Sequence, residues 1–284
     1  MQKKHFLIGL ALLVTACSQP SNVTETPEVN PQASKVVLFD LSKAEDAGNA
    51  DWRIDGAYSN WADSLRSLGY TVRTITSVNS STLAGASVLV VPEPQNPFSL
   101  TERDAILSAM NSGMGLFMIA DHRISDRNSN GWDSPEVFNG WDGSTPSSVS
   151  STYKWSLDSQ YQFKLKFSFN SSYSDPVYTA TPLTTTHPII QGSTSSTTDN
   201  VNSAGVYVGT SVDVTSGQSL MGANGKTYLA TSGYGSGRVV AWGDSSTFAD
   251  NTLSNGSTGQ YNNWVNLSNA NLARNVVKWL AKDL

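Results

Sequence analysis

Short, almost wholly apolar segments recur along this chain, at residues 36–39, 86–91, 115–120 and 239–242. An unbroken apolar run of this length is typical of a strand that is buried on both faces of a parallel sheet. Segments with helical spacing separate several of these runs, and residues 71–75 predict one further strand. The alternation of strand and helix predicts an α/β fold, in which a mostly parallel sheet carries helices on both faces.

The helical segments carry local start and stop signals. Residues 58–68 have apolar side chains at helical spacing and end before Gly69, a residue suited to a helix C-terminus. Ser99 and Glu102 have the spacing of a capping box and predict the start of the next helix. A last helix is predicted from about residue 268, with an apolar stripe that faces the core.

Residues 123–235 break this pattern, because they are rich in Ser, Thr, Asn and Gly. Within them, residues 161–167 alternate apolar and charged side chains, which indicates a half-exposed antiparallel strand. We therefore expect one α/β domain over residues 35–284, in which residues 123–235 form a β-rich insertion or extension.

The N-terminus predicts a lipoprotein signal. Two lysines and an apolar run too short to span a bilayer precede Cys17, the only cysteine of the chain. Residues 14–17 resemble the lipobox of bacterial lipoproteins, so residues 1–16 would be removed and Cys17 would carry the lipid. The alternative is an ordinary signal peptide followed by a chance cysteine. In the lipoprotein interpretation, residues 17–34, which are polar and contain prolines, would be a disordered tether between the lipid and the folded domain. Ser18 after the cysteine favours the outer membrane.

The net charge and the cysteine content of the chain restrict the classes of partner and cofactor that we expect. The formal net charge is −5, and loss of the signal would remove Lys3 and Lys4 and make the protein more acidic. Nucleic acid is therefore an unexpected partner, because its binding depends on cationic side chains. With Cys17 lipidated, the folded part would have neither a disulfide nor a zinc–thiolate site. No sequence pattern indicates a nucleotide cofactor.

Acidic residues follow three of the predicted strands: Asp40, Asp121 and Asp244. His122 comes directly after the second of them. Ligands of parallel sheets bind at the carboxyl ends of the strands, so these side chains are candidates for a site. A divalent cation would relieve their mutual repulsion. The alternative is that each aspartate caps a helix or holds a turn. Ser245 and Ser246 are possible hydroxyl donors to a ligand, but no serine triad is recognisable.

A loop after this histidine resembles the first half of a calcium-binding loop. Its oxygen-bearing side chains alternate before the bend at Gly131. The candidate ligands of calcium or a similar cation are Asp126, Asn128, Asn130 and Asp133. The bidentate acid of the full pattern is missing, since Val137 stands in its place. The alternative is an Asn/Gly-rich turn held by bonds from side chains to the backbone.

His187 and several tryptophans are weaker candidates. Pro188 favours an extended backbone at His187, which has either a structural or a site role. Five tryptophans lie in polar stretches and either stack on sugars or are partly buried. They are Trp52, Trp132, Trp141, Trp155 and Trp264.

Several segments together resemble a branch of the class I glutamine amidotransferase-like superfamily that consists of secreted bacterial proteins. They are residues 36–40, 47–52 with Asp55, 119–122, 125–135 and 237–246. The resemblance implies a flavodoxin-like sheet. It also departs from the superfamily, because Asp121 and His122 stand where a glutamine amidotransferase has its nucleophilic cysteine. Glutaminase activity is therefore excluded on chemical grounds.

These observations lead to two hypotheses. The first is a cell-envelope lipoprotein with a cation-dependent hydrolase site, in which Asp121, His122 and Asp244 act on a metal-bound water. The surrounding rim would contain Asp40, Asp51, Asp55 and His187. The second is a non-catalytic lipoprotein that binds a glycan or another envelope component and uses calcium as a structural staple.

Overall fold

The computed structural model describes residues 35–140, 157, 162–168, 178–193 and 197–284. The predicted signal peptide, the lipidated Cys17 and the tether to residue 34 lie outside the described residues, as do Trp141 and Trp155. Residues 34–284 form one compact unit. Within the described residues, no helix combines the length and the apolar character needed to cross a membrane.

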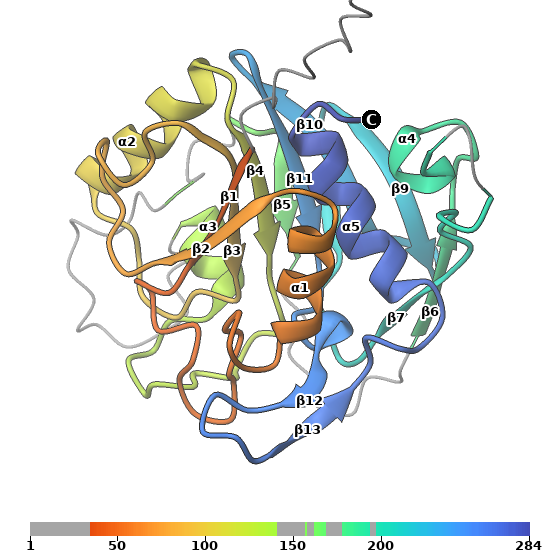
Figure 1. The fold of residues 1–284 in the computed structure, drawn as a ribbon. Coiled ribbons are helices and arrows are strands. Elements are labelled where there is room, and N and C mark those ends of the chain that lie inside the picture. The colour runs from red at the N-terminus through yellow and green to blue at the C-terminus, as the bar shows by residue number, and fades with distance from the viewer. Residues whose placement is uncertain (1–34, 141–156, 158–161, 169–177, 194–196) are drawn as a thin grey trace, which may run out of the picture. The chain divides into compact units, whose positions relative to one another are not determined.

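The described part of the compact unit is built on a nine-stranded sheet, shown in Figure 1, with the order β2-β1-β3-β4-β11-β10-β9-β6-β7. The first five strands of this order are parallel. They are β2 (Thr71–Ile75), β1 (Val36–Asp40), β3 (Ala86–Pro92), β4 (Gly115–Ile119) and β11 (Gly237–Trp242). The α/β class predicted from the sequence is confirmed.

The other four strands of the sheet pair antiparallel, beginning with β10 alongside β11. They are β10 (Lys226–Tyr234), β9 (Gln218–Ala223), β6 (Tyr178–Pro182) and β7 (Ala204–Val206). The segment predicted as a β-rich insertion therefore widens the central sheet. Two small antiparallel pairs lie outside it, β5 (Leu165–Phe167) with β8 (Val212–Val214) and β12 (Asp250–Thr252) with β13 (Thr258–Asn262).

The helices cover both faces of the sheet. Helices α1 (Ser59–Ser67) and α5 (Asn269–Leu280) lie in front of it in Figure 1. Side chains of α2 (Leu100–Asn111) and α3 (Ser134–Asn139) belong to a second buried cluster, which takes the opposite side chains of the strands. The capping box predicted at Ser99 and Glu102 is confirmed, with both of its hydrogen bonds present.

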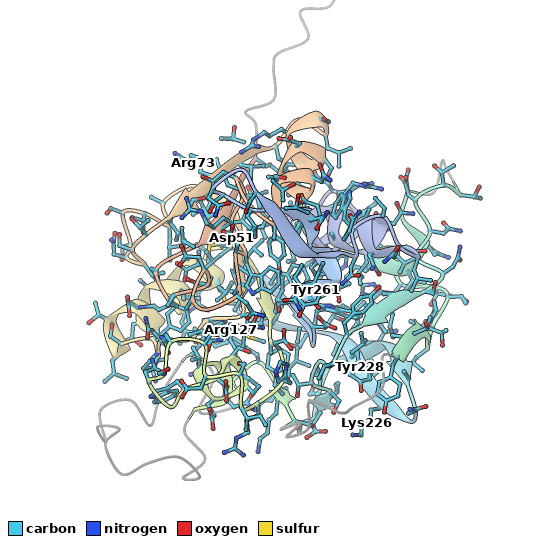
Figure 2. The ribbon with its side chains drawn as sticks, turned by 90° about the horizontal axis from the view of Figure 1, so that it is seen from below. Asp51, Arg73, Arg127, Lys226, Tyr228 and Tyr261 are labelled. Atoms are coloured by element: carbon cyan, nitrogen blue, oxygen red, sulfur yellow. The ribbon has the colours of Figure 1, made fainter. Side chains whose placement is uncertain are left out.

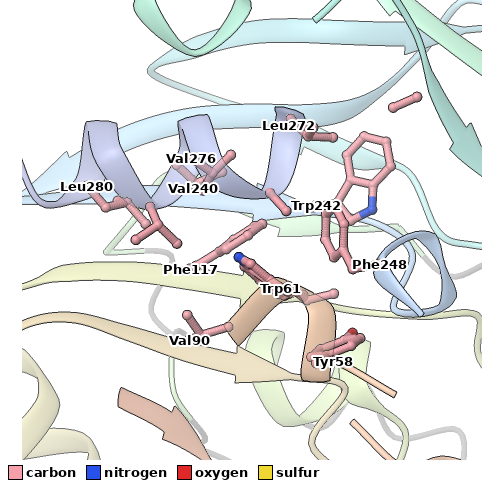
Figure 3. Close-up of a cluster of buried hydrophobic side chains, with 14 of the residues drawn as sticks. Tyr58, Trp61, Val90, Phe117, Val240, Trp242, Phe248, Leu272, Val276 and Leu280 are labelled. Atoms are coloured by element: carbon pink, nitrogen blue, oxygen red, sulfur yellow. The ribbon is translucent and has the colours of Figure 1, made fainter. Parts of the chain in front are cut away.

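An aromatic cluster fixes α1 and the short 3-10 helix η2 (Ser246–Phe248) against the sheet, as Figure 3 shows. The ring centroids of Trp61 and Phe248 are 5.0 Å apart, and those of Trp61 and Phe117 are 5.9 Å apart. These rings are fully buried, and each contributes about 1.5–3 kcal/mol relative to exposure. The cluster therefore holds η2, and with it the loop after β11, in a fixed position at the end of the sheet.

Candidate active site

Asp121 and His122 follow the central strand β4 and are both buried, 3% and 8% exposed. One carboxylate oxygen of Asp121, Oδ1, accepts the backbone N–H of His122 at 2.6 Å and lies 2.7 Å from His122 Nδ1. Burial lowers the pKa of His122, but the hydrogen bond and charge of Asp121 outweigh it, so the net shift is upward. Asp121 therefore fixes the orientation of the imidazole and stabilises its protonated form.

Glu93, at the end of the neighbouring strand β3, is fully buried behind this pair. Its Oε2 accepts hydrogen bonds from Trp52 Nε1 at 2.6 Å and from Ser245 Oγ at 2.7 Å. Ser245 Oγ also lies 2.5 Å from Asp121 Oδ2, so one hydroxyl links the two carboxylates. Burial raises the pKa of Glu93, and the charge of Arg127 opposes the shift. Glu93 also has a positive φ of 47°, which an L-residue rarely adopts.

Arg127 is the counter-ion of the two carboxylates. Its Nε lies 2.5 Å from Glu93 Oε1, and its NH2 lies 3.6 Å from Asp121 Oδ2. NH1 donates to Asn49 Oδ1. Gly48, with φ of 63°, lies against the Arg127 backbone, where an added Cβ would be 3.0 Å from the Arg127 carbonyl oxygen. The loop between β1 and α1 therefore holds the guanidinium in place.

Asp244, after β11, is also buried and lies next to this cluster. Its Oδ1 accepts both the N–H of Ser246, at 2.9 Å, and the Ser246 hydroxyl, at 2.7 Å, while Oδ2 accepts the N–H of Tyr207. Burial, followed by the charge of Asp121, raises the pKa of Asp244 to about 8. Asp244 therefore holds the loop after β11 in position and is mostly protonated at neutral pH.

A cavity of about 210 Å³ opens beside these groups. Figure 2 shows Arg127 and Tyr261 near the middle of the face seen from below. Most of the cavity surface is polar, and its lining residues are Asn49, Asp121, His122, Ser125, Arg127, Tyr207, Val208, Ser246 and Tyr261. A cavity of this size suits a small polar ligand or the end group of a larger one.

In the predicted cation loop, side chains bind the backbone. Asp126 Oδ1 accepts the N–H groups of Asn130 and Gly131, at 2.8 and 2.9 Å. Asn130 Oδ1 accepts the N–H of Trp132 at 2.8 Å, and Asn128 Nδ2 donates to Asn96 Oδ1 at 3.0 Å. This pattern corresponds to the turn that was the alternative interpretation of the sequence.

Asp133 has a capping role at the start of α3, where a capping box with Glu136 is present. Its Oδ2 accepts the N–H of Ile124 at 2.6 Å, and its Oδ1 accepts from the Asp126 N–H at 2.6 Å and from Ser125 Oγ at 2.7 Å. Within the described residues, no group of three or more His, Cys, Asp and Glu side chains is placed to hold a metal ion.

The other rim candidates do not line the cavity. Asp40 accepts the N–H of Ser42 at 2.9 Å, and burial raises its pKa to about 6. Asp51 accepts the N–H of Ser254 at 2.6 Å, and the exposed Asp55 pairs with Arg53.

His187 caps the short helix α4 (Pro188–Gln191) by accepting the N–H of Ile189 at 3.2 Å. Its ring lies 5.1 Å from that of Trp279, and burial lowers its pKa to about 4. Trp52, Trp132 and Trp264 are all buried, so they offer no exposed surface for stacking on sugars.

The strand-end rule found Asp121, His122 and Asp244, but sequence reasoning missed Glu93. The same rule would have found it, because Glu93 follows the apolar run of residues 86–91 after a single proline. Arg127 lies within a segment of the noted resemblance, but no local signal assigned it a role. Its partner Glu93 lies 34 positions away, so the pair forms only when the sheet does.

Comparisons with solved structures support the fold. The N-terminal domain of mmIFT52 is 13% identical, with a TM-score of 0.57, and the match covers 86% of this chain and 97% of that one. A protein from Bacteroides uniformis described as ThuA-like is 12% identical, with a TM-score of 0.48 and coverages of 93% and 95%. At 13% identity, the likeness to the first of these structures shows the fold alone.

Sequence comparison identifies the family. No curated protein sequence matches this chain. The model of the family described as "Domain of unknown function (DUF4350)" matches residues 54–265. The matched residues begin just before α1 and include every lining residue of the cavity except Asn49. The chain therefore belongs to the DUF4350 family.

Proposed function

We propose that the cavity is the site of a hydrolase, in which Asp121 and His122 activate a water molecule. The observation that carries the proposal is the 2.7 Å contact between Asp121 Oδ1 and His122 Nδ1 at the wall of a polar cavity. A carboxylate that orients an imidazole also stabilises the charge that the imidazole gains when it takes up a proton. This arrangement is typical of general acid–base catalysis by histidine.

In the proposed reaction, His122 Nε2 accepts a proton from water while the water oxygen attacks the electrophilic atom of the substrate. The bond to the leaving group then breaks, and the protonated His122 returns the proton to it. Asp121 stabilises the imidazolium between the two steps. A positioned base of this kind typically accelerates a reaction by about 10²–10⁴-fold.

The steps of this reaction need no divalent cation, and the cation dependence of the site predicted from the sequence stays a prediction. The predicted ligands Asp126 and Asp133 direct their oxygens to backbone N–H groups, which compete with a cation for the same lone pairs. A structural cation at this loop stays a prediction, to be tested by melting with calcium and with chelator.

We also infer a flavodoxin-like, class I glutamine amidotransferase-like core. Support comes from the order β2-β1-β3-β4-β11 of the parallel strands, which corresponds to the 2-1-3-4-5 order of doubly wound folds. The lipobox-like residues 14–17 support a lipoprotein anchored at Cys17 in the cell envelope, with the outer membrane favoured.

The test is a panel of chromogenic carboxylic esters, phosphoesters and glycosides. The purified residues 18–284 would be assayed as wild type and as His122→Asn and Asp121→Asn. We expect one substrate class to be hydrolysed, and each substitution to lower kcat by about 10²-fold or more. His187→Asn is the matched control, because it alters the other described histidine outside the cavity and keeps a side chain that can cap α4. No turnover by the wild type, or equal turnover by His122→Asn, would contradict the proposal.

A further inference from the structure

Arg127 has more donors than the described residues satisfy. A guanidinium carries five N–H groups in a rigid plane. Among the described residues, hydrogen bonds are present for Nε, with Glu93, and for one N–H of NH1, with Asn49. The contact of NH2 with Asp121 Oδ2 is 3.6 Å long, which is an ion pair but too long for a hydrogen bond.

The guanidinium is also held where a ligand would meet it. The Arg127 side chain is only 11% exposed and lines the cavity together with His122. Glu93 and Asn49 hold the guanidinium by hydrogen bonds, and Gly48 packs against the Arg127 backbone. A preorganised guanidinium loses little entropy when it binds a planar or tetrahedral oxyanion, and it binds either through two parallel hydrogen bonds.

The charged groups at the cavity are compatible with the binding of an anion. The Ser245 hydroxyl has one proton, yet its oxygen lies 2.7 Å from Glu93 Oε2 and 2.5 Å from Asp121 Oδ2. This hydroxyl and the Arg127 guanidinium thus occupy oxygens of both carboxylates. In the lining of the cavity itself, Arg127 and, once protonated, His122 stand against the single carboxylate of Asp121, so an anion completes the balance of charge.

We propose that the cavity binds the oxyanion group of a small ligand, a carboxylate or a phosphate, through the unfilled N–H groups of Arg127 beside His122. The inference names the ligand class of the proposed hydrolytic site and therefore rests on that proposal. The cavity volume of about 210 Å³ has room for an oxyanion with a few attached atoms.

The experiment is calorimetric titration of residues 18–284 with acetate and with inorganic phosphate, at pH 6 and at ionic strength held constant with sodium chloride. We expect at least one of the two anions to bind in one-to-one stoichiometry. Tighter binding of phosphate would indicate a phosphate-bearing ligand, and tighter binding of acetate would indicate a carboxylate-bearing one. Failure of both to bind at 50 mM, a concentration on the scale of the weakest specific sites, would overturn the inference.

Variants separate the cavity from adventitious binding. Arg127→Met should weaken binding at least tenfold, the effect of losing about 1.4 kcal/mol of charge-assisted hydrogen bonding. Arg127→Lys keeps a positive charge for Glu93 and so protects the fold, but it lacks the planar fork and should also weaken binding. Arg66→Met, which removes an exposed arginine on α1, is the control. Binding by both Arg127 variants that equals the wild type would overturn the inference.

The experiments distinguish failure of the hydrolase proposal from failure of the oxyanion inference. His122→Asn should abolish turnover yet leave acetate or phosphate bound through Arg127. Turnover that depends on His122, without binding of either anion, would overturn only the oxyanion inference. Anion binding that depends on Arg127, without hydrolysis of any substrate in the panel, would leave a binding cavity and overturn the hydrolase.

Discussion

Removal of the Glu93 side chain should destabilise the protein more than any exposed ion pair could. Glu93 is fully buried and accepts hydrogen bonds from Trp52, Ser245 and Arg127. Glu93→Ala would leave the Arg127 guanidinium buried without its closest carboxylate. Removing one partner of a buried ion pair typically costs about 3–5 kcal/mol of the free energy of unfolding. For a domain of about 250 residues, each kcal/mol lowers Tm by about 2–4 °C, so we expect a fall of roughly 6–20 °C.

The assay is urea unfolding of residues 18–284, followed by circular dichroism. Asp63→Ala is the matched control, because it removes the carboxylate of an exposed ion pair with Arg66 and should cost less than about 1 kcal/mol. The combination of Glu93→Leu with Arg127→Met should cost less than the sum of the two single substitutions, by about 0.5–3 kcal/mol, because the partners interact directly. A loss in Glu93→Ala no larger than in Asp63→Ala, or strict additivity in the double variant, would refute the buried-pair reasoning.

Four further predictions use other parts of the chain. Gly243→Ala should lower the free energy of unfolding by about 1–3 kcal/mol, because an added Cβ would overlap the Thr210 carbonyl oxygen. Gly233→Ala, whose nearest contact would be 3.4 Å, should change little in the same urea assay. Between pH 4 and 8 the folded state holds a proton on Asp244 that the unfolded state releases, so the free energy of unfolding should fall as pH rises, and Asp244→Asn should lessen the slope measured by urea titrations across this range. Asp133→Ala should cost about 0.5–2 kcal/mol even in EDTA, as the loss of a helix cap would, and a cost seen only with calcium would instead indicate a cation site. Cys17→Ser should move the full-length protein from the membrane to the soluble fraction and end its labelling by palmitate, and unchanged fractionation would contradict the lipoprotein prediction.

Local patterns predicted the parallel half of the sheet well. The almost wholly apolar runs became β1, β3, β4 and β11, because strands buried on both faces need apolar side chains at nearly every position. The capping box at Ser99 is equally local, and the structure contains it. The place of β6 and β7 in the same sheet was not predictable in this way, because β6 pairs with β7 and β9 across long stretches of sequence, for example at Thr181 and Gly222. By contrast, β9, β10 and β11 follow one another through short turns.

In the candidate site, too, the sequence predicts local features but not the contacts between distant residues. Asp121 and His122 were identified because both follow an apolar strand directly, a signal contained in a few residues. The links to Ser245 and Arg127 depend on which strand ends meet, and no short window of sequence contains that information. Asp126 and Asp133 had the spacing of cation ligands, but the backbone folds so that its own N–H groups reach their oxygens. Spacing alone does not distinguish these two uses of a carboxylate.

The most direct test of the proposed acid–base pair is proton NMR of the imidazole N–H groups. A proton held between Asp121 and His122 Nδ1 at 2.7 Å should resonate well downfield of the backbone amides and be protected from solvent. We expect this signal in the wild type and in His187→Asn, and its loss in Asp121→Asn and His122→Asn. A wild-type spectrum without this signal, or with one that survives in Asp121→Asn, would contradict the account.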